Sequence, residues 1–167
     1  SRSGQGQVVD AAILDGAVTS LTPFFGLRAA GMWTEGRGNN LLDGASPFVS
    51  PYRTSDGEHV FVSPLEPKFF AIMLDRMGID DLEAERQYDP AYWPEIRARL
   101  EREFALRTRD EWANLLEGFD ACCTPVLGLT ELADHPHIKE RGLIEEVDGL
   151  AQPAPAPRFS RTSAHVR

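Results

Sequence analysis

Residues 41–70 read LLDGASPFVSPYRTSDGEHVFVSPLEPKFF, and this stretch decides the expected fold. Two strands are expected, at 52–54 and 59–63, because short runs of β-favouring residues flank a turn sequence. Gly57 lies in that turn and can supply the positive φ that a hairpin requires. Pro64 should end the second strand, since proline has no N–H to donate to a sheet. The stretch therefore predicts an antiparallel hairpin.

A helix should follow the hairpin at once. Pro67 suits the first turn of a helix, and Gly78 is the expected C-terminal residue. Between them the apolar residues recur at helical spacing: Phe69, Phe70, Ile72, Met73 and Met77. Glu66 thus lies where a strand end meets a helix start. By spacing alone it is a helix cap or a surface acid that favours the helix dipole.

Composition limits the class of protein. The chain has 167 residues, 42% of them hydrophobic and 26% charged, which is typical of one soluble globular domain. Its formal net charge of -9 argues against general nucleic-acid binding, because that requires clustered Lys and Arg. No apolar run approaches the length of a membrane span. The N-terminal residues resemble no signal peptide and include no initiator Met, so we expect a cytoplasmic protein that begins inside a longer one.

Helices are expected to dominate the rest of the chain. A helix over 7–21 carries apolar residues around most of its circumference and should be buried on several sides. Thr108 and Glu111 form a capping box that opens a helix ending at Gly118. The other expected elements are a helix from Pro23 toward Gly31, a short helix within 79–92, a helix from Pro94, a strand over 122–128, short helices at 130–132 and 135–142, a strand over 143–147 and an extended proline-rich passage at 152–157.

Three further groups of residues suggest chemistry. Arg37 in a glycine-rich loop is either a phosphate contact or a solvated side chain. His135 and His137 invite a metal site, but a proline separates them and no zinc spacing is present, which favours capping and surface roles. Cys122 and Cys123 fit neither a disulfide framework nor a Cys-x-x-Cys site. A strand of reduced, buried cysteines explains this pair better than a nucleophile, because no cationic group accompanies them.

Three motifs resemble one protein family: GNNLLDGASPF at 38–48, LEPKF at 65–69 and HPHIKERG at 135–142. They are similar to the α-methylacyl-CoA racemase branch of the family III CoA-transferases. In that branch a Leu-Glu-Pro-x-Phe run supplies a glutamate beside the catalytic histidine, whereas the transferase branch more often carries an Asn-Asp pair. The resemblance therefore implies a catalytic role for Glu66. It also makes Leu42, Phe48 and Leu65 candidates for an apolar wall along the substrate's acyl chain, with ordinary core packing as the alternative.

The resemblance covers only the second half of the family. It implies a mixed α/β fold, the small domain of these enzymes, with helices around a short sheet that contains a β-hairpin. The nucleotide-type (Rossmann-like) large domain is not part of this chain. We accordingly expect residues 1–30 to be a helical connection from that domain, 31–150 to be the small domain, and 151–167 to be a proline-rich return segment.

The function implied is epimerisation at the carbon α to a CoA thioester, in fatty acid metabolism, with no activity expected without the large domain. CoA would enter as part of the acyl-CoA substrate, so no separate cofactor and no metal are expected. The partner would be the large domain or a second subunit, since family members form interlocked homodimers. Nucleic acid and membrane are not expected partners. Two alternatives stay open: a CoA-transferase of the same family, and a non-catalytic partner domain for a separately encoded large subunit.

Overall fold

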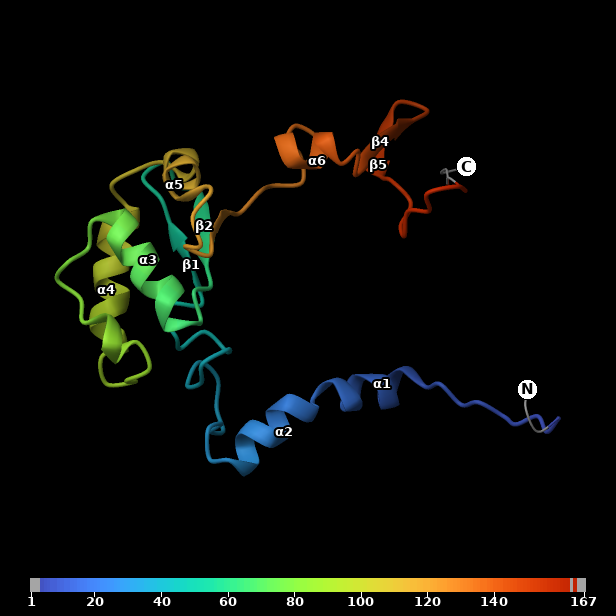
Figure 1. The fold of residues 1–167 in the computed structure, drawn as a ribbon, viewed down its shortest axis with the longest axis horizontal. Helices are drawn as coiled ribbons and strands as arrows, with labels where there is room; N and C mark the ends of the chain where they lie inside the picture. Colours follow the sequence, from blue (N-terminus) through green and yellow to red (C-terminus); the bar gives the residue numbers. More distant parts are fainter. Residues whose placement is uncertain (1–3, 163, 165–167) are drawn as a thin grey trace. The chain divides into compact units, whose positions relative to one another are not determined.

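The fold is that of a computed structural model, which describes residues 4–162 and 164 (Figure 1). The chain divides into two compact units, Ser1–Thr124 and Pro125–Arg167. Each unit is described separately below. The first contains the hairpin, the main core and the three helices that pack on it.

The predicted hairpin is confirmed. Strand β1 (Ser50–Arg53) pairs antiparallel with β2 (His59–Val62), and β3 (Cys123–Pro125) lies on the other side of β2. Gly57 has a φ of 88° in the turn, as the sequence predicts. The turn is closed by the amide of Thr54, which donates to the carbonyl of Glu58 over 2.9 Å. Each of the two strands ends one residue earlier than predicted.

The core lies on one face of the hairpin. Side chains along β1 and β2 alternate between buried and exposed, so Tyr52, Val60 and Val62 all point inward. Three helices supply most of the rest of this core: α3 (Pro67–Met77), α4 (Trp93–Phe104) and α5 (Arg109–Leu116). Figure 1 shows them gathered around the hairpin, with α4 in contact with β1 and α5 in contact with β2. This arrangement is the mixed α/β architecture predicted from the sequence.

Helix α3 begins and ends where its sequence predicts. Pro67 occupies its first turn, and Gly78 takes a left-handed conformation with a φ of 71° just after its last residue. In that position the Gly78 amide donates to the carbonyls of Asp75 and Leu74, which the helix would otherwise leave unpaired. Pro67 marks the start of α3, so Glu66 lies immediately before the helix.

Helices α4 and α5 carry several of the largest core side chains. Ile96, Leu100 and Phe104 recur every fourth residue along α4 and are fully buried. Trp112 of α5 is also fully buried, and its ring NH donates to the carbonyl of Phe104 over 3.0 Å. Between α3 and α4 the predicted short helix is a single 3-10 turn, η1 (Ala84–Arg86).

The predicted capping box is present at the start of α5. The Thr108 hydroxyl accepts from the Glu111 amide, and the Thr108 amide donates to the Glu111 carboxylate over 2.8 Å. We expect Thr108→Ala to lower the free energy of unfolding by about 1 kcal/mol, since one helix N–H loses its acceptor. Urea unfolding followed by Trp fluorescence measures this. As a control, Glu111→Gln keeps a side-chain oxygen in the box and should have a smaller effect; an equal or larger loss would contradict this account.

The N-terminal helix is shorter than predicted. Residues 7–12 are not helical, α1 covers Ile13–Ser20, and α2 covers Thr22–Ala29. Ala12 at the cap position is extended and offers no side-chain acceptor, and Val8 and Val9 are β-branched, so nothing stabilises an earlier start. The expected burial is also absent, because neither helix has a buried residue. Large apolar side chains are exposed along this segment: Val8, Val9, Ile13, Leu14, Val18, Leu21 and Phe25.

The second unit contains α6 (Pro136–Glu140) and a hairpin of β4 (Ile144–Val147) with β5 (Leu150–Pro153). The predicted helix at 135–142 and strand at 143–147 are both present in shortened form. Residues 130–132 form a turn rather than a short helix. Strand β5 includes the start of the proline-rich passage, which the sequence predicts only as extended chain.

Candidate functional site

Glu66 is exposed and occupies the N-cap position of α3, with φ −72° and ψ 135°. Its side chain accepts no hydrogen bond from the helix, although a carboxylate at this position can do so. Within the described part of the chain no hydrogen bond or ion pair reaches the Glu66 carboxylate. The position therefore agrees with a helix cap, but the side chain is not used as one. Its carboxylate is available to accept a hydrogen bond from a group outside this chain.

The segment that carries Glu66 is held by residues from two later parts of the chain. The amide of Ser63 donates to the carbonyl of Cys122 over 2.8 Å. From the loop after η1, the Gln87 side chain donates to the carbonyls of Pro64 and Leu65, and the Tyr88 hydroxyl donates to the carbonyl of Leu65. The sequence analysis missed both Gln87 and Tyr88, because no periodicity or motif singles them out.

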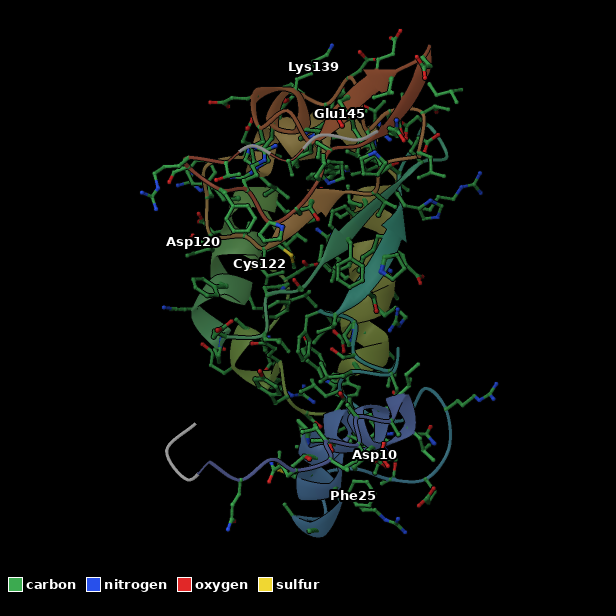
Figure 2. The ribbon with its side chains drawn as sticks, turned by 90° about the vertical axis from the view of Figure 1, so that its right-hand side faces the viewer. Asp10, Phe25, Asp120, Cys122, Lys139 and Glu145 are labelled. Atoms are coloured by element: carbon green, nitrogen blue, oxygen red, sulfur yellow. The ribbon has the colours of Figure 1, made fainter. Side chains whose placement is uncertain are left out.

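Cys122 lies close enough to Glu66 to be affected by its charge. Burial raises the pKa of the Cys122 thiol, and the negative charges of Glu66 and Asp120 raise it further. Figure 2 labels Asp120 and Cys122 on the segment between α5 and β3, with the Cys122 sulfur in yellow. Cys122 adopts a φ of 47°, which side-chain-bearing residues rarely do. A raised pKa leaves little thiolate at neutral pH and opposes a nucleophilic role.

The second cysteine behaves as the sequence analysis expects of a packed strand residue. Cys123 lies in β3 against the core, and burial raises its pKa to about 12. Tyr88 belongs to the same neighbourhood as Glu66, because burial and the Glu66 charge both raise the pKa of its hydroxyl. The charge of Glu66 thus acts on both Tyr88 and Cys122, and the charge of Asp120 acts on Cys122 as well; we call these four residues the Glu66 cluster.

This cluster predicts a change in thiol reactivity. Removing the Glu66 charge in Glu66→Gln should lower the pKa of Cys122, increase its thiolate fraction and speed its alkylation by iodoacetamide near pH 8. Asp120→Asn should act in the same direction, because Asp120 also raises this pKa. The rate at Cys122 is read by fragmentation (tandem) mass spectrometry of the peptide, in which fragment ions that divide the chain between the two cysteines assign the alkylated one. Asp75→Asn, an exposed acid near the other end of α3, is the control; an unchanged rate in Glu66→Gln would exclude this electrostatic contact.

The three apolar candidates have different environments. Phe48 is completely buried, with its ring against the rings of Phe70, Tyr88 and Trp93. Leu65 is partly buried and packs against the same core. Phe48, Leu65 and Glu66 are thus brought together, with Tyr88 in contact with the first two. Leu42 is 48% exposed and does not belong to the partly buried side chains that pack against this core.

The loop that carries Leu42 is tied down by its polar residues. Asn40 is buried, accepts from the Thr34 amide over 2.7 Å, and donates to the Asp43 carboxylate over 2.7 Å. Arg97 of α4 donates to the carbonyls of Gly44 and Ala45. These bonds fix the approach to Phe48 and leave Leu42 on the surface. Arg37, the other candidate of this loop, is exposed.

Other possible sites lie apart from Glu66. An open pocket of about 590 Å³ lies between β1 and the end of α4, and none of the predicted site residues lines it. His135 caps α6 by position and His137 lies within that helix. Over residues 4–162 and 164, no group of three or more His, Cys, Asp or Glu side chains could hold a metal ion. Helices in the same part of the chain are too short or too polar to cross a membrane.

Sequence comparison with known proteins finds relatives that agree with one another on the family. A sequence model of CoA-transferase family III matches residues 1–167. The mouse protein named alpha-methylacyl-CoA racemase is 39% identical over 165 residues, and its human counterpart is 37% identical over the same number. Each alignment covers 98% of this chain and 43% of the relative. The chain therefore spans less than half the length of these curated relatives.

Solved structures agree on the fold. Rv3272 from Mycobacterium tuberculosis superposes with a TM-score of 0.69 at 22% identity, over 99% of this chain and 43% of that one. A CAIB/BAIF family protein from Brucella suis gives a TM-score of 0.63 at 23% identity, over 97% and 44%. A Caenorhabditis elegans CaiB/baiF CoA-transferase family protein is 30% identical over 117 residues, which is 69% of this chain and 33% of the relative.

Proposed function

This chain belongs to CoA-transferase family III, and we propose that it is the C-terminal part of a 2-methylacyl-CoA racemase-like enzyme. The reaction would be epimerisation at the carbon α to a CoA thioester. One observation carries the proposal: two proteins named alpha-methylacyl-CoA racemase are 39% and 37% identical to the chain over 98% of its length. The Leu65-Glu66-Pro67 run, which resembles the racemase branch, agrees with it.

Such a reaction needs two acid/base groups on opposite sides of the α carbon and a means of stabilising the enolate. In this proposal both groups come from the large domain, and the chain described here contributes Glu66. The carboxylate would accept a hydrogen bond from the catalytic histidine, which fixes the tautomer of the imidazole and favours its protonated form. The exposure of Glu66 and the lack of a cap bond to α3 leave its carboxylate able to do this.

The acyl chain would lie along Leu42 and Leu65, and Phe48 would pack against Leu65 in the core. The 48% exposure of Leu42 allows direct contact with a substrate, whereas Phe48 is completely buried. CoA enters this scheme as part of the substrate, so no separate cofactor is proposed. We also propose, as the resemblance implies, that the enzyme acts in the cytoplasm and in fatty acid metabolism.

We propose the large domain, or a second subunit in an interlocked homodimer, as the partner of this chain. The exposed apolar side chains of residues 8–25 support this, because a surface of that kind is normally covered by protein. The same observation favours a second candidate function, a non-catalytic domain that associates with a separately encoded large subunit. A CoA-transferase is the other alternative, and the C. elegans relative is named as a member of that family.

The test is α-proton exchange of a 2-methylacyl-CoA in deuterated water, followed by mass spectrometry. This chain alone should show no exchange, and the chain mixed with a large domain from the same source should show it. Acyl transfer between CoA and a free acid, without exchange, would identify a transferase. If neither reaction occurs although sedimentation shows a complex, the chain is a non-catalytic partner domain.

A further inference from the structure

The segment between β2 and α3 belongs to neither element, which leaves its backbone polar groups in need of partners. Pro64 and Pro67 have no N–H, and the amide of Leu65 turns back to the carbonyl of Ser63 over 2.8 Å. The carbonyls of Pro64 and Leu65 lie outside the hydrogen-bond ladders of the sheet and the helix. A buried carbonyl without a donor is costly, so the donors for these two oxygens decide how the segment is held.

Gln87 supplies a donor for both oxygens. Its side-chain nitrogen lies 2.7 Å from the carbonyl oxygen of Pro64 and 3.1 Å from that of Leu65. The residue is 1% exposed, and a carboxamide is rarely buried so completely unless its bonds fix a particular geometry. Its backbone is fixed as well, because the Trp93 ring NH donates to the Gln87 carbonyl over 2.8 Å. The amide of Gln87 donates to Ala84 in η1 over 3.1 Å.

Tyr88 reaches the same place from the next position in the chain. Its hydroxyl donates to the carbonyl of Leu65, so this oxygen accepts from two consecutive residues. The ring of Tyr88 packs edge-on against the buried ring of Phe48, with centroids 5.3 Å apart. Leu65 immediately precedes Glu66, and the peptide plane between them contains the Leu65 carbonyl oxygen that accepts both hydrogen bonds. The direction in which the Glu66 side chain leaves the backbone therefore depends on this contact.

We infer that Gln87 and Tyr88 are positioning residues, which hold the backbone of Pro64 and Leu65 so that the Glu66 carboxylate stays in place. We do not expect Gln87 or Tyr88 to contact the reacting atoms. The inference rests on the proposed function only in that it expects Glu66 to orient the catalytic histidine that transfers the proton. A displacement of about 1 Å at a catalytic group can cost about 100-fold in rate, so loss of these bonds should affect the chemical step.

The first test measures exchange in the full-length parent. Gln87→Met keeps the length of the side chain and removes both donors, and Tyr88→Phe removes the hydroxyl and keeps the ring. We expect kcat to fall about tenfold or more in Gln87→Met and less in Tyr88→Phe, with KM changed by less than about twofold. Tyr52→Phe is the matched control, because it removes a buried hydroxyl that donates to the carbonyl of Pro47 over 2.5 Å. It should lower the thermal midpoint and leave kcat unchanged.

A double-mutant cycle separates positioning from general loss of stability. In the Glu66→Gln background, Gln87→Met should cause no further loss of kcat if Gln87 acts through Glu66. A full additional tenfold loss in that background would overturn the inference. An equal loss of kcat in Tyr52→Phe and Gln87→Met would overturn it too, since a structural effect would then explain both.

The second test does not depend on activity and can use this chain. The alkylation rate of Cys122 reports the nearby charge of Glu66, so Gln87→Met should change that rate about twofold or more in the wild-type background and not in Glu66→Gln. If the alkylation rates follow this pattern but α-proton exchange is unaffected by Glu66→Gln, positioning is supported and the proposed function is rejected. A change in rate that persists in Glu66→Gln would reject positioning, whatever the enzyme does.

Discussion

Exchange of the α proton by the full-length parent should fall about 100-fold or more when Glu66 is replaced by glutamine. Glutamine has nearly the same shape but carries no charge, so it cannot stabilise a protonated histidine. The loss should appear mainly in kcat, because a group that orients the catalytic base does not by itself bind the acyl-CoA.

The effect of Glu66→Gln on exchange can be separated from an effect on stability, because the Glu66 side chain contributes little to the fold. It is exposed, and α3 begins at Pro67 without a hydrogen bond from its side chain. Glu66→Gln should therefore leave the thermal midpoint and the circular dichroism of the protein unchanged. Glu117→Gln is the matched control, because Glu117 is also an exposed glutamate at a helix end, just after α5. Equal exchange rates in the two variants would make Glu66 an ordinary surface acid at the start of α3.

Local signals explain which parts of this fold can be predicted from the sequence. The turn at Gly57, the proline at the start of α3 and the glycine at its end each act over four or five residues, and all three are found where expected. The capping box of Thr108 and Glu111 is likewise local. Such features need no knowledge of the tertiary structure, because the backbone conformation that they favour is their own.

The hairpin of the second unit has a local turn signal in its sequence that the prediction above does not include. Asp148 and Gly149 have φ values of 54° and 80°, and an Asp-Gly pair is a strong signal for a two-residue hairpin turn. The prolines that follow favoured an extended segment instead. Pro153 is the last residue of β5, where a missing N–H costs least, so the prolines do not prevent the strand.

The site itself was only half predictable. A motif makes Glu66 a candidate, but Gln87 and Tyr88, which bind the backbone just before it, lie more than twenty residues later in a loop without periodicity. The effect of the Glu66 charge on the pKa of Cys122 depends on β3 lying beside β2, which no spacing in the sequence reveals. Positions of this kind are set by tertiary packing. A buried glutamine with two carbonyl partners can be recognised only in the folded structure.

The second large effect is expected in stability, from Phe48→Ala. The ring is completely buried and contacts three other aromatic rings, so its removal should lower the free energy of unfolding by about 3–5 kcal/mol. Leu42→Ala, a few residues earlier on the exposed loop, should change it by less than about 0.5 kcal/mol. Urea unfolding of the two variants, followed by Trp fluorescence, gives both values.

Variants at the same two positions test which of the two side chains would contact the acyl group. Because Phe48 is buried beneath Tyr88 and Trp93, a mild change such as Phe48→Leu should reduce stability and leave the preference among acyl-CoA chain lengths unaltered. Leu42→Ala should do the opposite and raise KM for the preferred chain, since truncation removes apolar contact with bound substrate at little cost to the free protein. If Phe48→Leu shifts the chain-length preference more than Leu42→Ala, Phe48 lines the acyl pocket and its burial in the free chain must be relieved when substrate binds.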